Sequence, residues 1–122
     1  MNQKNPREVL RDFLAAWYRQ DWKDMFIYCQ DTWCSKSNHS PEVLRDMFGL
    51  RELMTFTIGN EVPIKDSIFK LGVAKDFICE IEWRNPKDKI YKHQIRARLL
   101  CEIAPYQPRP DGDWGVNPIS IL

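Results

Sequence analysis

The sequence has no long hydrophobic run and no excess of charge of one sign. No apolar stretch approaches the roughly 20 residues that cross a bilayer. The 18 basic and 17 acidic residues give a formal net charge of +1, whereas nucleic-acid binders and polybasic membrane-surface proteins carry a basic excess. We therefore expect neither a nucleic acid nor a membrane as a partner.

Common catalytic and metal-binding motifs are also missing. The sequence contains no Gly-rich phosphate loop, no Ser-His-Asp arrangement and no His-Glu-x-x-His motif. Cys29, Cys34 and His39 follow one another at steps of five. On a helix, five residues turn the chain by about 500° and point the two cysteines apart. Because no second ligand pair has zinc-site spacing, we predict no metal site and no cofactor.

The four cysteines form no C-x-x-C pair, and each lies within or beside an apolar pattern, which is typical of reduced, buried thiols. The N-terminus lacks the basic stretch and apolar core of a signal peptide. We expect a cytoplasmic protein, or an exported one if a signal segment has been removed. A length of 122 residues fits a single domain over 1–122.

Apolar residues in the first third recur at steps of three and four, which predicts three helices. Each helix begins at a capping residue, and proline follows the first and third caps. These caps are Asn5, Asp21 and Ser40. The second apolar stripe continues to Trp33, and Gly49 is placed to end the third helix in the left-handed conformation.

From Leu53 onward the period changes to two, which predicts an antiparallel sheet of four or more strands. In the first strand, Met54, Phe56 and Ile58 share one face, opposite Leu53. Further strands are predicted over residues 68–83, 91–103 and 114–121. Pro118 interrupts the last of them, which then bends or lies at an edge.

The charge pattern predicts how the two middle strands pair. If Arg84 faces Ile90, residues of opposite charge oppose each other on the outer face. These pairs are Glu82 with Lys92 and Asp76 with Arg98. A slip by one residue would mix apolar and charged positions. The outer face is then a mixed-charge surface, either solvated or a polar homodimer interface.

Two segments carry a family resemblance. The stretch FLAAWYRQDWKDM (Phe13–Met25) and the closing DWGVNP (Asp113–Pro118) resemble the opening helices and final strand of the nuclear transport factor 2-like superfamily, which includes ketosteroid isomerases and polyketide cyclases (SnoaL-like proteins). The opening is also similar to the small amino-terminal domain of some penicillin-binding transpeptidases. The resemblance implies an α+β, cystatin-like cone, with three N-terminal helices packed on a strongly curved antiparallel sheet. Many relatives bind a small apolar molecule inside the cone, and others dimerise through the sheet face.

The inward strand positions contain no carboxylate, so the aspartate base of the isomerase-like relatives is not matched. His93 is the one titratable side chain that shares a face with the predicted core, which makes it the candidate acid–base residue. Aromatic and histidine side chains are the candidates for lining a pocket, with the core as the alternative place for the tryptophans. The candidates are Trp17, Phe26, Phe77, Trp83, Tyr91, His93 and Trp114.

These observations favour a non-catalytic binding or assembly module with a mostly apolar cavity. A small apolar ligand and a homodimer through the sheet face are the partners expected. One alternative is an isomerase- or cyclase-like enzyme, or a carrier, that uses His93 as its acid–base residue. Another is an accessory domain related to cell-wall transpeptidases.

Overall fold

Helices come first along the chain and strands follow. The structure, a computed structural model, describes residues 4–64, 72–103, 107–109 and 111–122. In this part of the chain the helices are α1 (Pro6–Arg19), α2 (Trp22–Ile27), α3 (Asp31–Cys34) and α4 (Pro41–Phe48). The strands are β1 (Glu52–Val62), β2 (Ala74–Arg84), β3 (Ile90–Ile103), β4 (Gln107–Pro108) and β5 (Asp113–Val116), before the 3₁₀ helix η1 (Pro118–Ile121).

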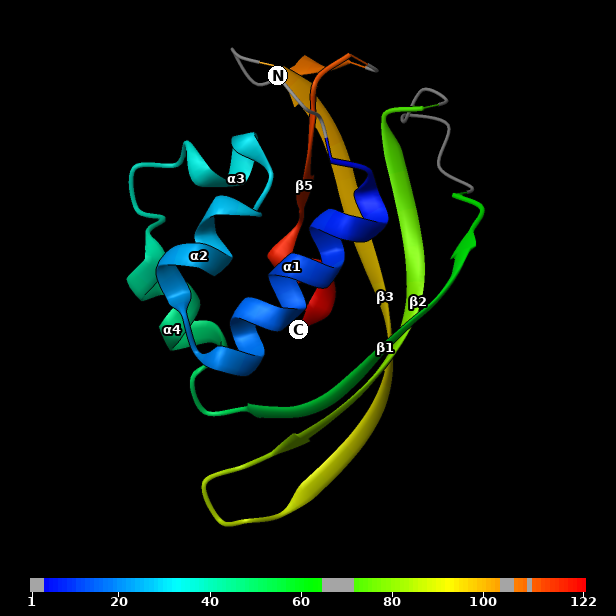
Figure 1. Cartoon of the computed structure of the whole chain (residues 1–122). Coiled ribbons are helices and arrows are strands. Elements are labelled where there is room, and N and C mark those ends of the chain that lie inside the picture. The colour runs from blue at the N-terminus through cyan, green and yellow to red at the C-terminus, as the bar shows by residue number, and fades with distance from the viewer. Residues whose placement is uncertain (1–3, 65–71, 104–106, 110) are drawn as a thin grey trace.

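The strands form one antiparallel sheet in the order β1-β2-β3, with β4 and β5 both paired to β3. Figure 1 shows a bent sheet whose inner face is covered by the helices, while the β2–β3 hairpin extends beyond them. The predicted α+β class and antiparallel sheet are confirmed. The predicted strand over 68–83 begins later, at Ala74, and residues 68–71 of that prediction lie outside the described residues.

α1 begins as the sequence predicts. The side chain of Asn5 accepts a hydrogen bond from the backbone N–H of Glu8, and Pro6 occupies the first turn. The apolar stripe of the helix is buried against the sheet. α1 ends at Arg19, and its C-cap residue Gln20 has left-handed backbone angles (φ 57°, ψ 36°). Residues other than glycine adopt this conformation at an energetic cost.

The second predicted helix is divided into α2 and α3, so four helices replace the three expected. Between them, residues 28–30 pair with β5: Val116 N–H donates to Tyr28 O (2.8 Å) and Gln30 N–H donates to Val116 O (2.9 Å). Gly115 makes this approach possible, because a Cβ there would lie 2.4 Å from the Cα of Gln30. A tertiary strand contact therefore overrides the local helical pattern.

α4 begins after Ser40 and ends at Gly49, as predicted, but the backbone of Gly49 is not left-handed. Its angles (φ −64°, ψ −25°) are those of a right-handed helix. A Cβ at this position would lie 2.4 Å from the carbonyl oxygen of Arg45. Glycine is thus required here for close backbone packing, and the predicted left-handed cap is wrong.

The predicted pairing of β2 with β3 is confirmed. Arg84 opposes Ile90, and both predicted pairs of opposite charge oppose each other in this register. The connecting turn is closed by Asn85, whose side-chain oxygen accepts hydrogen bonds from the backbone of Lys87 and Lys89 (both 2.9 Å). The alternation of apolar and polar residues and the pairs of opposite charge therefore predicted the register of this hairpin correctly.

Two strand predictions are wrong in detail. An irregularity between Leu53 and Thr55 shifts the register of β1, so Leu53 turns inward opposite Trp83 and is buried. At the other end, β5 stops at Val116 and Pro118 opens η1, capped by the side chain of Asn117. Proline cannot donate to a strand ladder but fits the first turn of a helix.

The core fills the space between α1, α4 and the sheet. Trp17 packs on Phe48 with ring centroids 5.0 Å apart, and Phe13 meets Phe48 edge-on. The C-terminal Ile121 joins this core from η1. The last turn of the chain is thereby fixed beside β3, next to the exposed end of the sheet.

Candidate functional site

A groove lies at the end of the sheet, beside the C-terminal turn. It has a volume of about 390 Å³, and its walls come from β2, β3, η1 and the residue that precedes β1. The walls include Arg51, Ile81, Trp83, His93, Ile95 and Ile121. We call this cavity the end groove. Part of its wall comes from the β2–β3 hairpin, which extends beyond the helices (Figure 1).

Three rings stand side by side on the β2–β3 hairpin, and two of them, Trp83 and His93, line the end groove. Trp83 on β2 opposes Tyr91 on β3, and their rings stack with centroids 4.6 Å apart and an angle of 22°. His93 lies 5.9 Å from Trp83 and nearly parallel to it (12°). We call these three residues the aromatic ladder. It gives the groove a flat, apolar wall on a rigid hairpin.

Two hydrogen-bond donors at the end groove have no partner in the described structure. The indole Nε1 of Trp83 is buried and makes no hydrogen bond with any described residue. The guanidinium of Arg51 lies over the Trp83 ring, with Cζ 4.9 Å from the ring centroid. Within the described ranges this cation–π contact is the interaction shown for the guanidinium, with no carboxylate at ion-pair distance.

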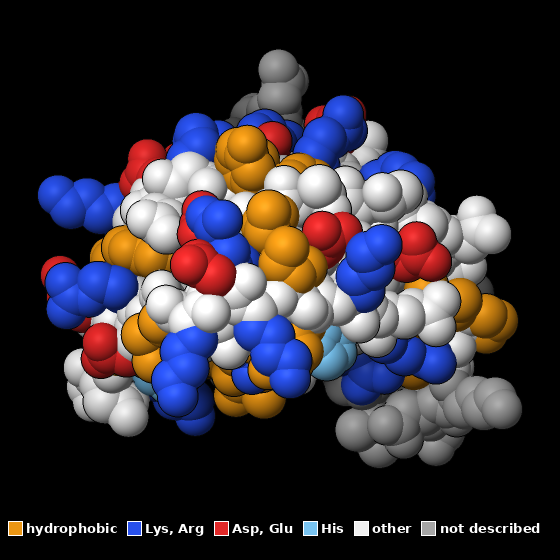
Figure 2. All heavy atoms as spheres, turned by 90° about the horizontal axis from the view of Figure 1, so that it is seen from below, with side chains coloured by type: hydrophobic (Ala, Val, Ile, Leu, Met, Phe, Trp, Pro, Cys, Tyr) orange, Lys and Arg blue, Asp and Glu red, His pale blue; other side chains and the backbone are white. Residues whose placement is uncertain are grey.

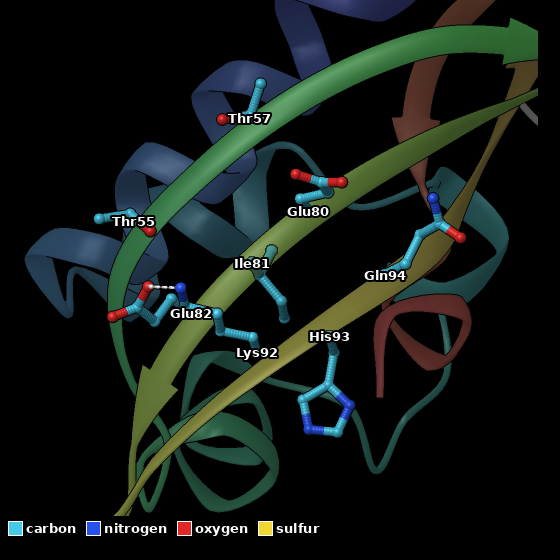
Figure 3. Close-up of a pocket in the computed structure, with 8 residues that line it drawn as sticks. All are labelled: Thr55, Thr57, Glu80, Ile81, Glu82, Lys92, His93 and Gln94. Carbon is cyan, nitrogen blue, oxygen red and sulfur yellow. Dashed lines mark ion pairs between the residues drawn. The ribbon is translucent and has the colours of Figure 1, made fainter.

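Acidic side chains are absent from the described lining of the end groove. Glu80 lies on the opposite side of the sheet from Ile81 and His93, as Figure 3 shows. Glu82 also faces outward, where its carboxylate is 3.9 Å from Lys92 Nζ. The alternation of the strands thus keeps these carboxylates on the outer face and leaves donors inside.

The structure brings three of the seven candidate pocket residues together: Trp83, Tyr91 and His93. Trp17 is 1% exposed, and its indole N–H donates to Arg51 O (2.9 Å). Phe77 is also in the core. Two further candidates pack elsewhere: Phe26 meets Trp33 edge-on, and Trp114 lies beside Lys75.

Sequence reasoning missed two parts of the end groove. Arg51 stands between α4 and β1, where no period marks it, and nothing in the local sequence predicts its place over Trp83. Ser120 and Ile121 fall in the strand predicted over 114–121, but they belong to η1 and, with Leu122, line the groove. Recognising Asn117-Pro118 as a helix cap followed by proline was the signal that could have found the second part.

A second hollow, of about 320 Å³, lies on the outer face of the hairpin (Figure 3). Its walls are polar and of mixed charge, with Thr55 and Thr57 beside Glu80 and the Glu82–Lys92 pair. Seen from below, the molecule shows acidic and basic side chains interspersed with hydrophobic ones (Figure 2). A solvated mixed-charge surface of this kind offers little to desolvate and hold an apolar ligand.

Two acids expected on the solvated outer face are in fact buried. Asp76 is 1% exposed and accepts hydrogen bonds from Arg96 Nε (2.6 Å) and Arg98 Nε (2.8 Å). Burial raises the pKa of Asp76, but these two arginines outweigh it and hold that pKa below the ordinary value. Glu102 is 3% exposed and accepts hydrogen bonds from the backbone and hydroxyl of Thr32.

The spacing of Cys29, Cys34 and His39 does not produce a metal site in the described residues. His39 hydrogen-bonds Trp33 O through Nδ1 (2.7 Å) and stacks on the Trp33 ring. The hydrogen bond between the two thiols raises the pKa of Cys29 and lowers that of Cys34. Cys29, Cys34 and Cys79 are free thiols; Cys34 is half-buried, and Cys29, Cys79 and Cys101 are buried.

Comparisons with known proteins do not indicate a function for this chain. No family model matches this chain. A stretch of 47 residues, 38% of the chain, is 40% identical to human "SH3 and multiple ankyrin repeat domains protein 2". The chain spans about 2% of the length of that protein. None of the helices in the described ranges has the length and apolar character to cross a membrane.

Proposed function

We propose that this protein is a non-catalytic binding module, and that the end groove holds a small molecule with an apolar, ring-shaped body. One observation carries this proposal: a groove of about 390 Å³ is lined by Trp83, His93 and three isoleucines, with no acidic side chain among its described walls. Apolar and aromatic walls of this kind hold the apolar body of a small molecule.

We further propose that the fold is the cone of the nuclear transport factor 2-like superfamily. Support comes from the order of helices before strands, the bent sheet and the helices on its inner face (Figure 1). In this architecture the end groove corresponds to the wide mouth of the cone. The apolar core fills the space further in, so a ligand is held at the mouth.

The lining of the end groove argues against general acid–base catalysis. His93 is exposed and lies in the aromatic ladder, beside Trp83 and Tyr91. A histidine that works as a base is usually oriented by a carboxylate, and no acid lines the described part of the groove. We therefore assign His93 to ligand contact. The homodimer, the relation to transpeptidase domains and the cytoplasmic location stay predictions.

The test of this proposal blocks the end groove and measures binding of a neutral probe, naphthalene methanol. Ile95 faces the groove and is half-buried, so Ile95→Trp fills it. Ile119→Trp is the matched control, because Ile119 is 61% exposed on η1 and outside the groove lining. Calorimetric titration is expected to show binding by the wild type and Ile119→Trp, and at least tenfold weaker binding by Ile95→Trp.

Thermal melts verify that both variants are folded before they are compared. The proposal fails if the wild type shows no binding at millimolar probe concentrations. It also fails if a folded Ile95→Trp variant binds as well as the control.

A further inference from the structure

We infer that the ligand of the end groove is an organic carboxylate: an apolar ring system that bears a carboxylate group, with Arg51 as its anion-binding residue. This inference rests on the function proposed above and adds the charge of the ligand to it. Arg51 has no acidic partner among the described residues, whereas Arg84, Lys92 and Arg96 each have one.

The cations on the neighbouring strands are paired. Arg84 binds Glu52 at 2.8 Å, Lys92 lies 3.9 Å from Glu82, and Arg96 binds Asp76 at 2.6 Å. Arg96 also lines the end groove, but its guanidinium is bound to Asp76. Arg51 lines the groove too, and its guanidinium has no ion pair or hydrogen bond to any described residue.

The backbone of Arg51 is held firmly on both sides. Its N–H donates to Phe48 O (2.9 Å), and its carbonyl accepts from the buried indole of Trp17 (2.9 Å). The guanidinium lies over Trp83, so the cation is held at the groove wall. A fixed position reduces the entropy lost when a ligand binds.

The donors at the groove match a carboxylate better than a neutral acceptor. A guanidinium presents parallel N–H donors whose spacing fits the two oxygens of a carboxylate. No acidic side chain lines the described groove, and the guanidinium of Arg51 makes no ion pair with a described residue, so its donors are available to an anion.

The remaining wall determines the body of the ligand. Ile81, Ile95 and Ile121 supply aliphatic contact, and the aromatic ladder supplies a flat surface. A polar anion such as inorganic phosphate leaves these side chains exposed to water. The walls therefore select an amphipathic molecule, with its carboxylate at Arg51 and its ring along the isoleucines.

The experiment compares two probes of nearly equal shape, naphthalene carboxylate and neutral naphthalene methanol, by calorimetric titration at low salt. Each is titrated into the wild type, Arg51→Met and Arg51→Lys. Arg11→Met is the matched control, since Arg11 is an exposed arginine on α1 outside the groove lining. Thermal melts check that every variant is folded.

We expect the wild type and Arg11→Met to bind the carboxylate about tenfold more tightly than the alcohol. In Arg51→Met the preference for the carboxylate over the alcohol is expected to disappear. Arg51→Lys retains part of the preference because it keeps the charge but loses the paired donors.

The two proposals fail in different ways. If the wild type binds neither probe, the function proposed for the end groove is wrong, and the carboxylate inference falls with it. If the alcohol binds as tightly as the carboxylate, or if Arg51→Met keeps the preference, the groove remains a binding site and the carboxylate inference alone is overturned.

Discussion

Asp76 is expected to be the most costly charged residue to replace on the sheet. Its carboxylate is 1% exposed and accepts three hydrogen bonds, from Arg96 Nε (2.6 Å), Arg98 Nε (2.8 Å) and Arg98 Nη2 (3.0 Å). Asp76→Asn keeps the shape but removes the charge, and it turns one acceptor into a donor that faces an arginine. The change therefore removes the negative charge that Asp76 supplies to the guanidinium groups of Arg96 and Arg98.

The structure sets the magnitude of this effect. A hydrogen bond to a charged group contributes roughly 1.5–3 kcal/mol, and breaking a fully buried ion pair costs roughly 3–5 kcal/mol. Arg96 and Arg98 are 48% and 26% exposed, so water recovers part of the loss. We expect Asp76→Asn to lower the free energy of unfolding by about 2–3 kcal/mol. At about 3–5 °C per kcal/mol for a domain of this size, Tm falls by about 6–15 °C.

The matched control is Glu82→Gln, the same kind of change on the same strand and face. Glu82 lies 3.9 Å from Lys92, whose side chain is 81% exposed, so the loss is expected to stay within about 0.5 kcal/mol. Urea unfolding followed by circular dichroism measures both variants. Equal, small losses for Asp76→Asn and Glu82→Gln would refute the reasoning.

The same residue predicts a pH dependence with a definite sign. The pKa of Asp76 is held below its ordinary value in the folded state. Its contribution is therefore complete above the unfolded pKa of about 3.9 and is lost as the pH falls through the lower folded pKa. The stability difference between wild type and Asp76→Asn should stay constant near neutral pH and shrink below about pH 4. A difference that instead grows with acid would contradict this assignment.

Three further predictions test other parts of the structure. Gln20→Gly removes the strain of the left-handed backbone at the C-cap of α1 (φ 57°) and should stabilise the protein by up to about 1 kcal/mol, whereas Gln20→Val should destabilise it. Urea unfolding that ranks the two variants in the opposite order would contradict the left-handed conformation of Gln20. Gly115→Ala sets a methyl group against the backbone of Gln30 and should cost about 1–3 kcal/mol in the same melts, so a neutral result counts against the β5 contact. The pKa of Cys34 is lowered, and burial raises the pKa of Cys79 to about 11. Iodoacetamide should therefore modify Cys34 before Cys79. Peptide mass spectrometry that finds Cys79 modified first would contradict this prediction.

The sheet hairpin could be predicted from sequence because its information is local. Alternation of period two and the charge pairs Glu82–Lys92 and Asp76–Arg98 are all contained in residues 76–98, and together they allow one register. The same holds for the Asn5 cap of α1, where the cap, the proline and the apolar stripe are adjacent in the chain. Local signals that agree with one another specify local structure.

Other features depend on contacts between residues that are distant in the sequence, and for that reason they could not be predicted from local patterns. The break after α2 follows from pairing of residues 28–30 with Val116, which no pattern near residue 29 reveals. One irregularity in β1 turns Leu53 from the predicted outer face to the core. Arg51 was missed because its place at the groove depends on contact with Trp83, which is distant in the sequence. The burial of Asp76 likewise required a second arginine that the pairing pattern did not include.

The central claim, that the end groove is a binding site, is tested most directly by the indole N–H signals in an NMR titration with naphthalene carboxylate. The chain has five tryptophans, and Trp83→Phe identifies the signal of Trp83. We predict that this signal moves and saturates, while those of the buried Trp17 and Trp33 stay in place. A Trp83 signal that stays unchanged up to millimolar probe would contradict the claim.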